Sequence, residues 1–192
     1  MKNKIDGVNL MVCGSQRFDD HEFVFSTLDS FHQQTRGNIR RVFTSKFSGA
    51  CEYARDWTQR TNKILVPSEK IEIVDYAFDM VLEQKNHSFY EDAEIPPFAI
   101  ANDPFFKKGQ AELMSKGVNF VICFPNAEGK LGASTANIKR FADLADIPYF
   151  NCSELLSLVN QHRDEVINAK NEEPKVEKAQ GAGFNNRHPN RR

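Results

Sequence analysis

The stretch Val8-Asn9-Leu10-Met11-Val12-Cys13-Gly14-Ser15 decides the fold of this chain. Its first six residues are almost wholly apolar, which is typical of a buried strand, and the Gly-Ser pair that follows indicates a turn. Asp19 and Asp20 come next and can cap a helix whose apolar residues Phe23, Leu28 and Phe31 lie near helical spacing. The start of the chain therefore predicts a strand, a turn and a helix.

The same alternation continues to about residue 169. We expect further strands at 39–44, 64–66, 118–124 and 147–150, and further helices at 49–60, from Ser68 through Ile73 and Ala77 to Val81, at 105–116, at 133–145 and from Ser153 to about 169. Strands separated by helices predict a parallel sheet with right-handed crossovers. The expected fold class is α/β, a Rossmann-like three-layer sandwich with a mostly parallel sheet of five strands.

Composition divides the chain into a domain and a tail. Residues 86–104 hold three of the eight prolines and little periodicity, so we expect a long loop inserted in a domain that covers residues 1–170. Residues 171–192 are polar, with Val176 and Phe184 as their only large apolar side chains. Such a segment buries too little surface to offset its ordering entropy, so we predict a disordered tail.

Charge and hydropathy narrow the class of protein. Lys and Arg number 25 and Asp and Glu 26, a net charge of -1, which excludes a protein that coats nucleic acid with a wholly basic surface. The longest apolar stretches fall well short of a membrane span or of the hydrophobic region of a signal peptide. The four cysteines form no CxxC pair, so we expect reduced thiols, no metal site and a cytoplasmic protein.

Three loops should carry the ligand, because parallel sheets bind ligands beyond the carboxyl ends of their strands. They follow the first, second and fourth expected strands and span residues 14–17, 45–50 and 125–135. Small residues allow a phosphate to approach the backbone, helix N-termini attract anions, and an arginine binds phosphate through two nitrogens. The candidate ligand-binding residues are Gly14, Ser15, Arg17, Ser48, Gly49, Asn126, Gly132, Ser134 and Thr135.

Phenylalanine is unusually frequent, with 16 residues against one Trp and four Tyr. Phe18, Phe43, Phe47 and Phe124 flank the three loops. We expect some of these rings to form an apolar wall beside the ligand, or a contact between subunits of a homo-oligomer.

Three motifs resemble the YspA/YpsA-related branch of the SLOG superfamily. They are Val12-Cys13-Gly14-Ser15-Gln16-Arg17-Phe18-Asp19-Asp20, then Ser48-Gly49-Ala50-Cys51-Glu52-Tyr53-Ala54-Arg55-Asp56-Trp57, and Phe124-Pro125 through Ser134-Thr135-Ala136-Asn137-Ile138-Lys139-Arg140. The resemblance spans residues 8–150, and its middle motif is the most specific. It implies a Rossmann-like fold that binds nucleotides or nucleotide-derived ligands.

The chain also departs from the family's pattern. Cys51 replaces an Asp, Asn126-Ala127 replaces Gly-Gly, and the family's Arg-Asn pair is not recognisable near residues 102–109. The related "Lonely guy" phosphoribohydrolases carry a Glu where this chain has Ile138, and that carboxylate would stabilise an oxocarbenium-like transition state. Glu52 or Glu128 would have to replace it.

These observations lead to one main hypothesis and two alternatives. The main hypothesis is a SLOG-type sensor or binding protein for a nucleotide or a nucleotide-derived sugar phosphate, with no further cofactor. One alternative is an N-glycosidic hydrolase of nucleoside monophosphates. The other is a nucleic-acid-binding or interaction module that uses the tail, against which the acidity of the domain counts.

Overall fold

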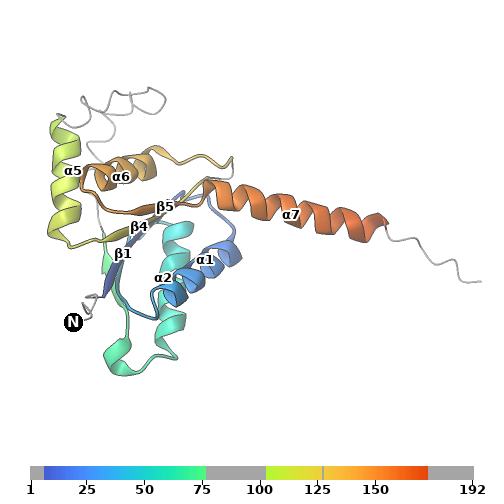
Figure 1. Cartoon of the computed structure of the whole chain (residues 1–192), viewed down its shortest axis with the longest axis horizontal. Helices are drawn as coiled ribbons and strands as arrows, with labels where there is room; N and C mark the ends of the chain where they lie inside the picture. Colours follow the sequence, from blue (N-terminus) through green and yellow to red (C-terminus); the bar gives the residue numbers. More distant parts are fainter. Residues whose placement is uncertain (1–6, 77–102, 127, 173–192) are drawn as a thin grey trace, which may run out of the picture. The chain divides into compact units, whose positions relative to one another are not determined.

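A computed structural model describes residues 7–76, 103–126 and 128–172 of the chain. It confirms the α/β fold class, with five strands that are all parallel in the order β3-β2-β1-β4-β5 (Figure 1). The strands are β1 (Val8–Gly14), β2 (Ile39–Thr44), β3 (Glu72–Asp75), β4 (Phe120–Phe124) and β5 (Tyr149–Asn151). The buried run that opens the sequence is thus the central strand of the sheet.

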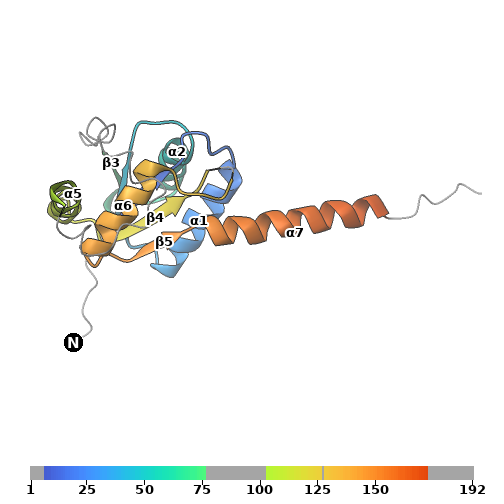
Figure 2. The same cartoon turned by 90° about the horizontal axis from the view of Figure 1, so that it is seen from above.

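Helices cover both faces of this sheet. The described helices are α1 (His21–Gln34), α2 (Ala50–Asn62), the 3-10 helix η1 (Pro67–Glu69), α5 (Pro104–Ser115), α6 (Ala133–Leu144) and α7 (Ser153–Glu172). Helices α1 and α2 lie on one face, and α5 and α6 on the other (Figure 2). Phe106, Leu113 and Phe141 from α5 and α6 pack with Met11 and Val121 from the central strands. The arrangement is the three-layer sandwich that the alternating pattern predicts.

The prediction for the third strand and the helix after it was wrong. Residues 64–66 lie in the connection after α2, where the side chain of Ile64 is 84% exposed, and the strand begins at Glu72 instead. The helix expected from Ser68 is only the short η1, and Ile73 belongs to β3. The side chain of Asn62 accepts the N–H of Ile71 and donates to its carbonyl, both at 2.8 Å. These two bonds hold the chain beside α2 and let it enter the sheet only after residue 71.

Several expectations fall wholly or partly outside the described residues. Residues 77–81 of the expected helix and 86–102 of the expected loop are among them, whereas Asp103 caps α5. Of the expected tail, residues 171 and 172 belong to α7 and the rest lies outside. The chain forms two compact units, residues 1–158 and 159–192, and the boundary between them falls within α7.

No described helix combines the length and the apolar character that crossing a membrane requires.

Candidate functional site

The strand order places a topological switch point between β1 and β4. From β1 the chain adds β2 and β3 on one side, and it then returns to add β4 and β5 on the other side. At the carboxyl ends of the two strands, Gly14 lies opposite Phe124. Ligands of open parallel sheets bind at such a point. We call residues 14–17, 45–50, 125–126 and 128–135, which surround it, the loop edge.

The first two loops of the loop edge are in direct contact. The N–H of Ala50 donates to the carbonyl of Ser15 at 3.4 Å, and the hydroxyl of Ser48 donates to the carbonyl of Gln16 at 3.2 Å. Gly49 has φ 73°, and a Cβ at that position would lie 2.3 Å from the Ser15 carbonyl oxygen. Only glycine fits this conformation and this approach. Gly49 therefore joins the two loops.

Gly14 is also needed for close packing. A Cβ at Gly14 would lie 2.7 Å from Cβ of Ala50 and 2.8 Å from Cβ of Phe124. The strand end, the start of α2 and the end of β4 thus meet at one residue without a side chain. Packing accounts for Gly14 and Gly49, two of the candidate ligand-binding residues, whether or not a ligand touches them.

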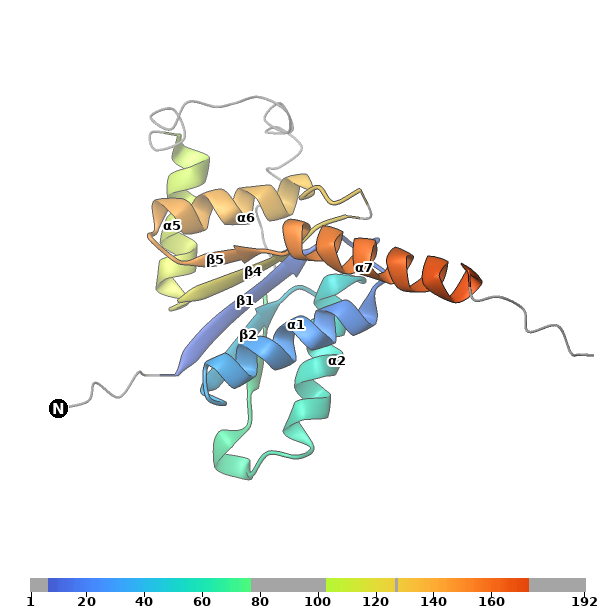
Figure 3. The same cartoon turned by 45° about the vertical axis from the view of Figure 1, so that its right-hand side comes forward.

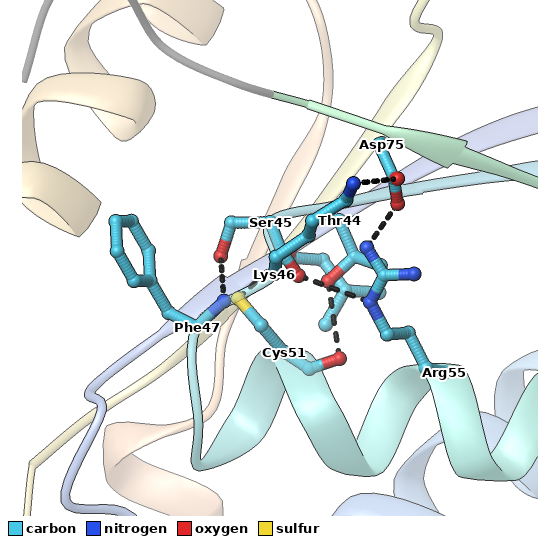
Figure 4. A network of polar contacts seen from close by, with 8 residues as sticks. Thr44, Ser45, Lys46, Phe47, Cys51, Arg55 and Asp75 are labelled. Carbon is cyan, nitrogen blue, oxygen red and sulfur yellow. Dashed lines mark hydrogen bonds and ion pairs between the residues drawn. The ribbon is translucent and has the colours of Figure 1, made fainter.

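A charged network fastens the second loop to β3. Asp75 forms ion pairs with Arg55 and with Lys46, the latter at 3.1 Å, and Arg55 Nε donates to the carbonyl of Ser45 at 3.2 Å (Figure 4). Hydrogen bonds from Arg55 and then from Lys46 lower the pKa of Asp75. The hydroxyl of Thr44 completes the network by donating to the carbonyl of Cys51 at 3.2 Å. Arg55 and Lys46 thus share the single negative charge of Asp75, and the network keeps one net positive charge.

Two side chains at the loop edge remain exposed and uncommitted. Arg17 makes no ion pair or side-chain hydrogen bond with the described residues, although its N–H donates to the hydroxyl of Ser15 at 3.1 Å. Phe47 is 48% exposed, and its ring points away from the charged network (Figure 4). The other three phenylalanines that flank the loops, Phe18, Phe43 and Phe124, are buried in the core. A free cation and an exposed ring thus lie in neighbouring loops.

The third loop is closed by Asn126. Its side-chain oxygen accepts the N–H groups of Glu128 and Lys130, at 3.0 and 2.9 Å, and its own N–H donates to the carbonyl of Lys130 at 2.7 Å. The oxygen of this candidate ligand-binding residue therefore shapes the loop. Further on, Thr135 is buried, Ser134 is exposed, and a Cβ at Gly132 would meet no atom within 4 Å.

Four of the helices that begin at this edge of the sheet, α1, α2, α5 and α6, are capped in two ways. Asp20 accepts the N–H of Phe23 at 2.9 Å at the start of α1, and Asp103 accepts that of Phe105 at 2.8 Å at the start of α5. Helices α2 and α6 begin after Gly49 and Gly132, and no side chain of the capping residue bonds to either helix. Neither helix has a capping carboxylate, but the start of α2 already has Glu52 in its first turn and the Ser15 carbonyl on the N–H of Ala50. The start of α6 has no acidic residue in its first turn, so it suits an anion from outside the chain better.

The residues that could supply a carboxylate for N-glycosidic hydrolysis are placed less favourably than those that could bind a phosphate. Ile138, which stands where the "Lonely guy" enzymes that the sequence resembles carry a Glu, is buried in the core between the sheet and α6. The two possible replacements, Glu52 and Glu128, are exposed, and Glu128 lies 3.9 Å from Lys130. A hydrolytic role for either residue stays a prediction.

A pair of thiols lies beneath the loop edge. Cys13 and Cys123 are aligned on β1 and β4, and their sulfur atoms are 3.6 Å apart. A hydrogen bond with Cys123 and burial raise the pKa of Cys13, and all four cysteines are buried as free thiols. In the part of the chain that the structure describes, no group of three or more His, Cys, Asp or Glu residues is arranged to hold a metal ion.

Comparisons with known proteins return no similarity: no family model matches the chain, and no curated protein or solved structure resembles it significantly.

Proposed function

We propose that this protein binds a nucleotide or a nucleotide-derived sugar phosphate at the loop edge, in the manner of a SLOG-type binding protein. The observation that carries the proposal is the pair of glycine-capped helix N-termini, those of α2 and α6, beside the switch point. Backbone N–H groups and the dipole of a helix N-terminus bind phosphate well. An aspartate cap would have opposed an anion at either helix.

The other parts of a nucleotide have partners at the same edge. The guanidinium of Arg17 supplies a positive charge in the loop after β1. Phe47 offers a ring face on which a base can stack. Stacking of this kind contributes about 1–3 kcal/mol per base. We assign the phosphate to the helix ends and to Arg17, and the base to Phe47.

The middle motif of the family resemblance supports the proposal in physical terms. Ala50, Ala54 and Trp57 are fully buried on one face of α2, and the indole N–H of Trp57 donates to Asp29 of α1 at 2.8 Å. Gly49 joins the first two loops, as described above. Gly49 and Ala50 of this motif lie at the loop edge, whereas Ala54 and Trp57 are buried further along α2, and we propose membership of the SLOG superfamily on this basis.

Isothermal titration calorimetry with a panel of AMP, ADP-ribose and cyclic AMP tests the proposal. We expect at least one of the panel to bind. We expect Arg17→Ala to weaken that binding by about tenfold or more, because a hydrogen bond to a charged group contributes about 1.5–3 kcal/mol. Arg36→Ala is the matched control, because Arg36 is equally exposed and follows α1 at the opposite end of the sheet. Absence of binding by every nucleotide at millimolar concentration would refute the proposal.

A second pair of variants tests the place of the base. Phe47→Ala should weaken nucleotide binding but leave the binding of inorganic phosphate unchanged, because the ring contacts only the base. Val66→Ala removes a comparably exposed apolar side chain, 54% exposed, from the connection after α2 and should change neither. Equal losses for nucleotide and phosphate in Phe47→Ala would show that the ring does not stack on the base.

A further inference from the structure

The last helix carries an apolar stripe that is half-buried at Leu155 and Val159 and exposed at Val166. Helix α7 is one continuous helix from Ser153 to Glu172 (Figure 3), and every side chain described from residue 160 to 168 is exposed. Val166 is 40% exposed. Val159 and Val166 are seven residues apart, with Leu155 and His162 four residues before each of them. This spacing is a heptad repeat, with valine at the a positions and leucine and histidine at the d positions.

From residue 163 on, the flanks of the stripe carry opposite charges, whereas the preceding e and g positions hold Leu156 and Leu158. Arg163, and by its place in the sequence Lys170, fall at e positions, whereas Glu165 and, again by sequence, Glu172 fall at g positions. In a parallel pair of helices, each g position faces the e position five residues later on the partner, so position 165 faces position 170. An antiparallel pair would instead set the acidic flank against itself and the basic flank against itself. The charge pattern therefore favours a parallel pair of identical helices.

From this pattern we propose that α7 pairs with α7 of a second copy of the chain as a short parallel coiled coil. Valine at a with leucine at d favours two strands over three or four. Two heptads are a short seam and the histidine layer is polar, so we expect a weak dimer that forms at high protein concentration. The proposal is independent of ligand binding, because it rests on α7 alone.

Sedimentation equilibrium of the full chain, from micromolar to millimolar concentration, tests the proposal. We expect a reversible monomer–dimer equilibrium. Val166→Glu places a charge in the seam and should lower the association constant by about tenfold or more. Ile167→Glu is the matched control, because Ile167 is 56% exposed, adjacent and at a b position outside the seam. A monomer at all concentrations, or a dimer that Val166→Glu leaves intact, would overturn the proposal.

The orientation of the helices has its own test. Val166→Cys places a thiol at an a position, where a parallel pair brings the two residues 166 together and an antiparallel pair keeps them apart. The four native cysteines are buried. We expect oxidised glutathione to cross-link Val166→Cys dimers but not those of Ile167→Cys. A dimer that does not cross-link through position 166 would contradict the parallel arrangement.

Discussion

Two pairs of helices begin at the same edge of the sheet, and their first residues differ. Helices α1 and α5 begin after an aspartate that accepts a backbone N–H of the first turn, whereas α2 and α6 begin after a glycine. An aspartate supplies both a hydrogen-bond acceptor and a negative charge to the helix end. A glycine supplies neither. At α2 the Ser15 carbonyl and Glu52 partly take these roles, whereas the first turn of α6 carries no acidic residue. Under the proposed function, this difference favours the two glycine-capped helices, and α6 above all, as the helix ends that bind the phosphate.

The two glycines differ as well. Gly49 has a positive φ and no room for a side chain, whereas Gly132 has φ -66° and open space around it. The first glycine is required by the fold. The second is not required by any described contact, which suits a role in ligand binding.

The largest effect is expected from Gly49→Ala. The strained φ and the close approach to the Ser15 carbonyl should together cost about 3 kcal/mol or more of the free energy of unfolding, measured by urea denaturation. Gly129→Ala is the control, because Gly129 has φ 77° but no atom within 4 Å of its would-be Cβ. It should lose only about 1 kcal/mol, the part due to the backbone conformation. Equal losses in the two variants would show that the contact between the loops is unimportant.

Gly132→Asp should give α6 an aspartate cap like those of α1 and α5. The new carboxylate should raise the free energy of unfolding by a few tenths of a kcal/mol and weaken nucleotide binding by about tenfold or more, because it competes with the phosphate. Gly132→Asn caps the helix without adding charge and should keep most of the binding. Undiminished binding by the Asp variant would place the phosphate away from α6.

Asp20→Ala makes the opposite change and removes the aspartate cap of α1. Loss of the hydrogen bond to the N–H of Phe23 should lower the free energy of unfolding by about 1 kcal/mol and leave nucleotide binding unchanged. Asp19→Ala is the control, because the exposed side chain of Asp19 does not cap α1. A loss of nucleotide affinity in Asp20→Ala alone would mean that α1 also contributes to the site.

The smallest expected effect comes from His32, whose ring contacts Trp57 and so helps to hold α2 against α1. His32 of α1 lies edge-on to Trp57 of α2 at 5.7 Å, and burial lowers the pKa of His32 below its usual 6.5. Below pH 6.5 the unfolded chain therefore binds a proton more readily than the folded chain, and stability falls as the pH falls. Fluorescence of Trp57, the only tryptophan, should report the protonation with a midpoint below pH 6.5. His32→Gln should remove that transition.

Local patterns predicted most of the fold. The apolar run before Gly14 gave the central strand, and Asp20 lies where a helix cap was expected. The prediction of the third strand failed because residues 64–66 are apolar but exposed, and apolar character alone does not reveal burial. The β-branched residues of Ile71-Glu72-Ile73-Val74 were the signal that would have found it.

The loop edge was predicted less completely. The sequence indicated which loops follow the strands, but not the strand order, which fixes the switch point between β1 and β4. It also could not distinguish Phe47 from the three buried phenylalanines beside the loops, or show that Lys46 shares Asp75 with Arg55. These facts depend on contacts between residues far apart in the chain.

Amide chemical shifts recorded during a titration with the nucleotide that binds test directly whether the phosphate lies at the N-termini of α2 and α6. We expect the largest changes in chemical shift in the first turns of α2 and α6, residues 50–52 and 133–135. The first turns of the aspartate-capped helices α1 and α5 should remain unchanged. Shifts centred on α1 or α5, or absent from both glycine-capped helices, would contradict it.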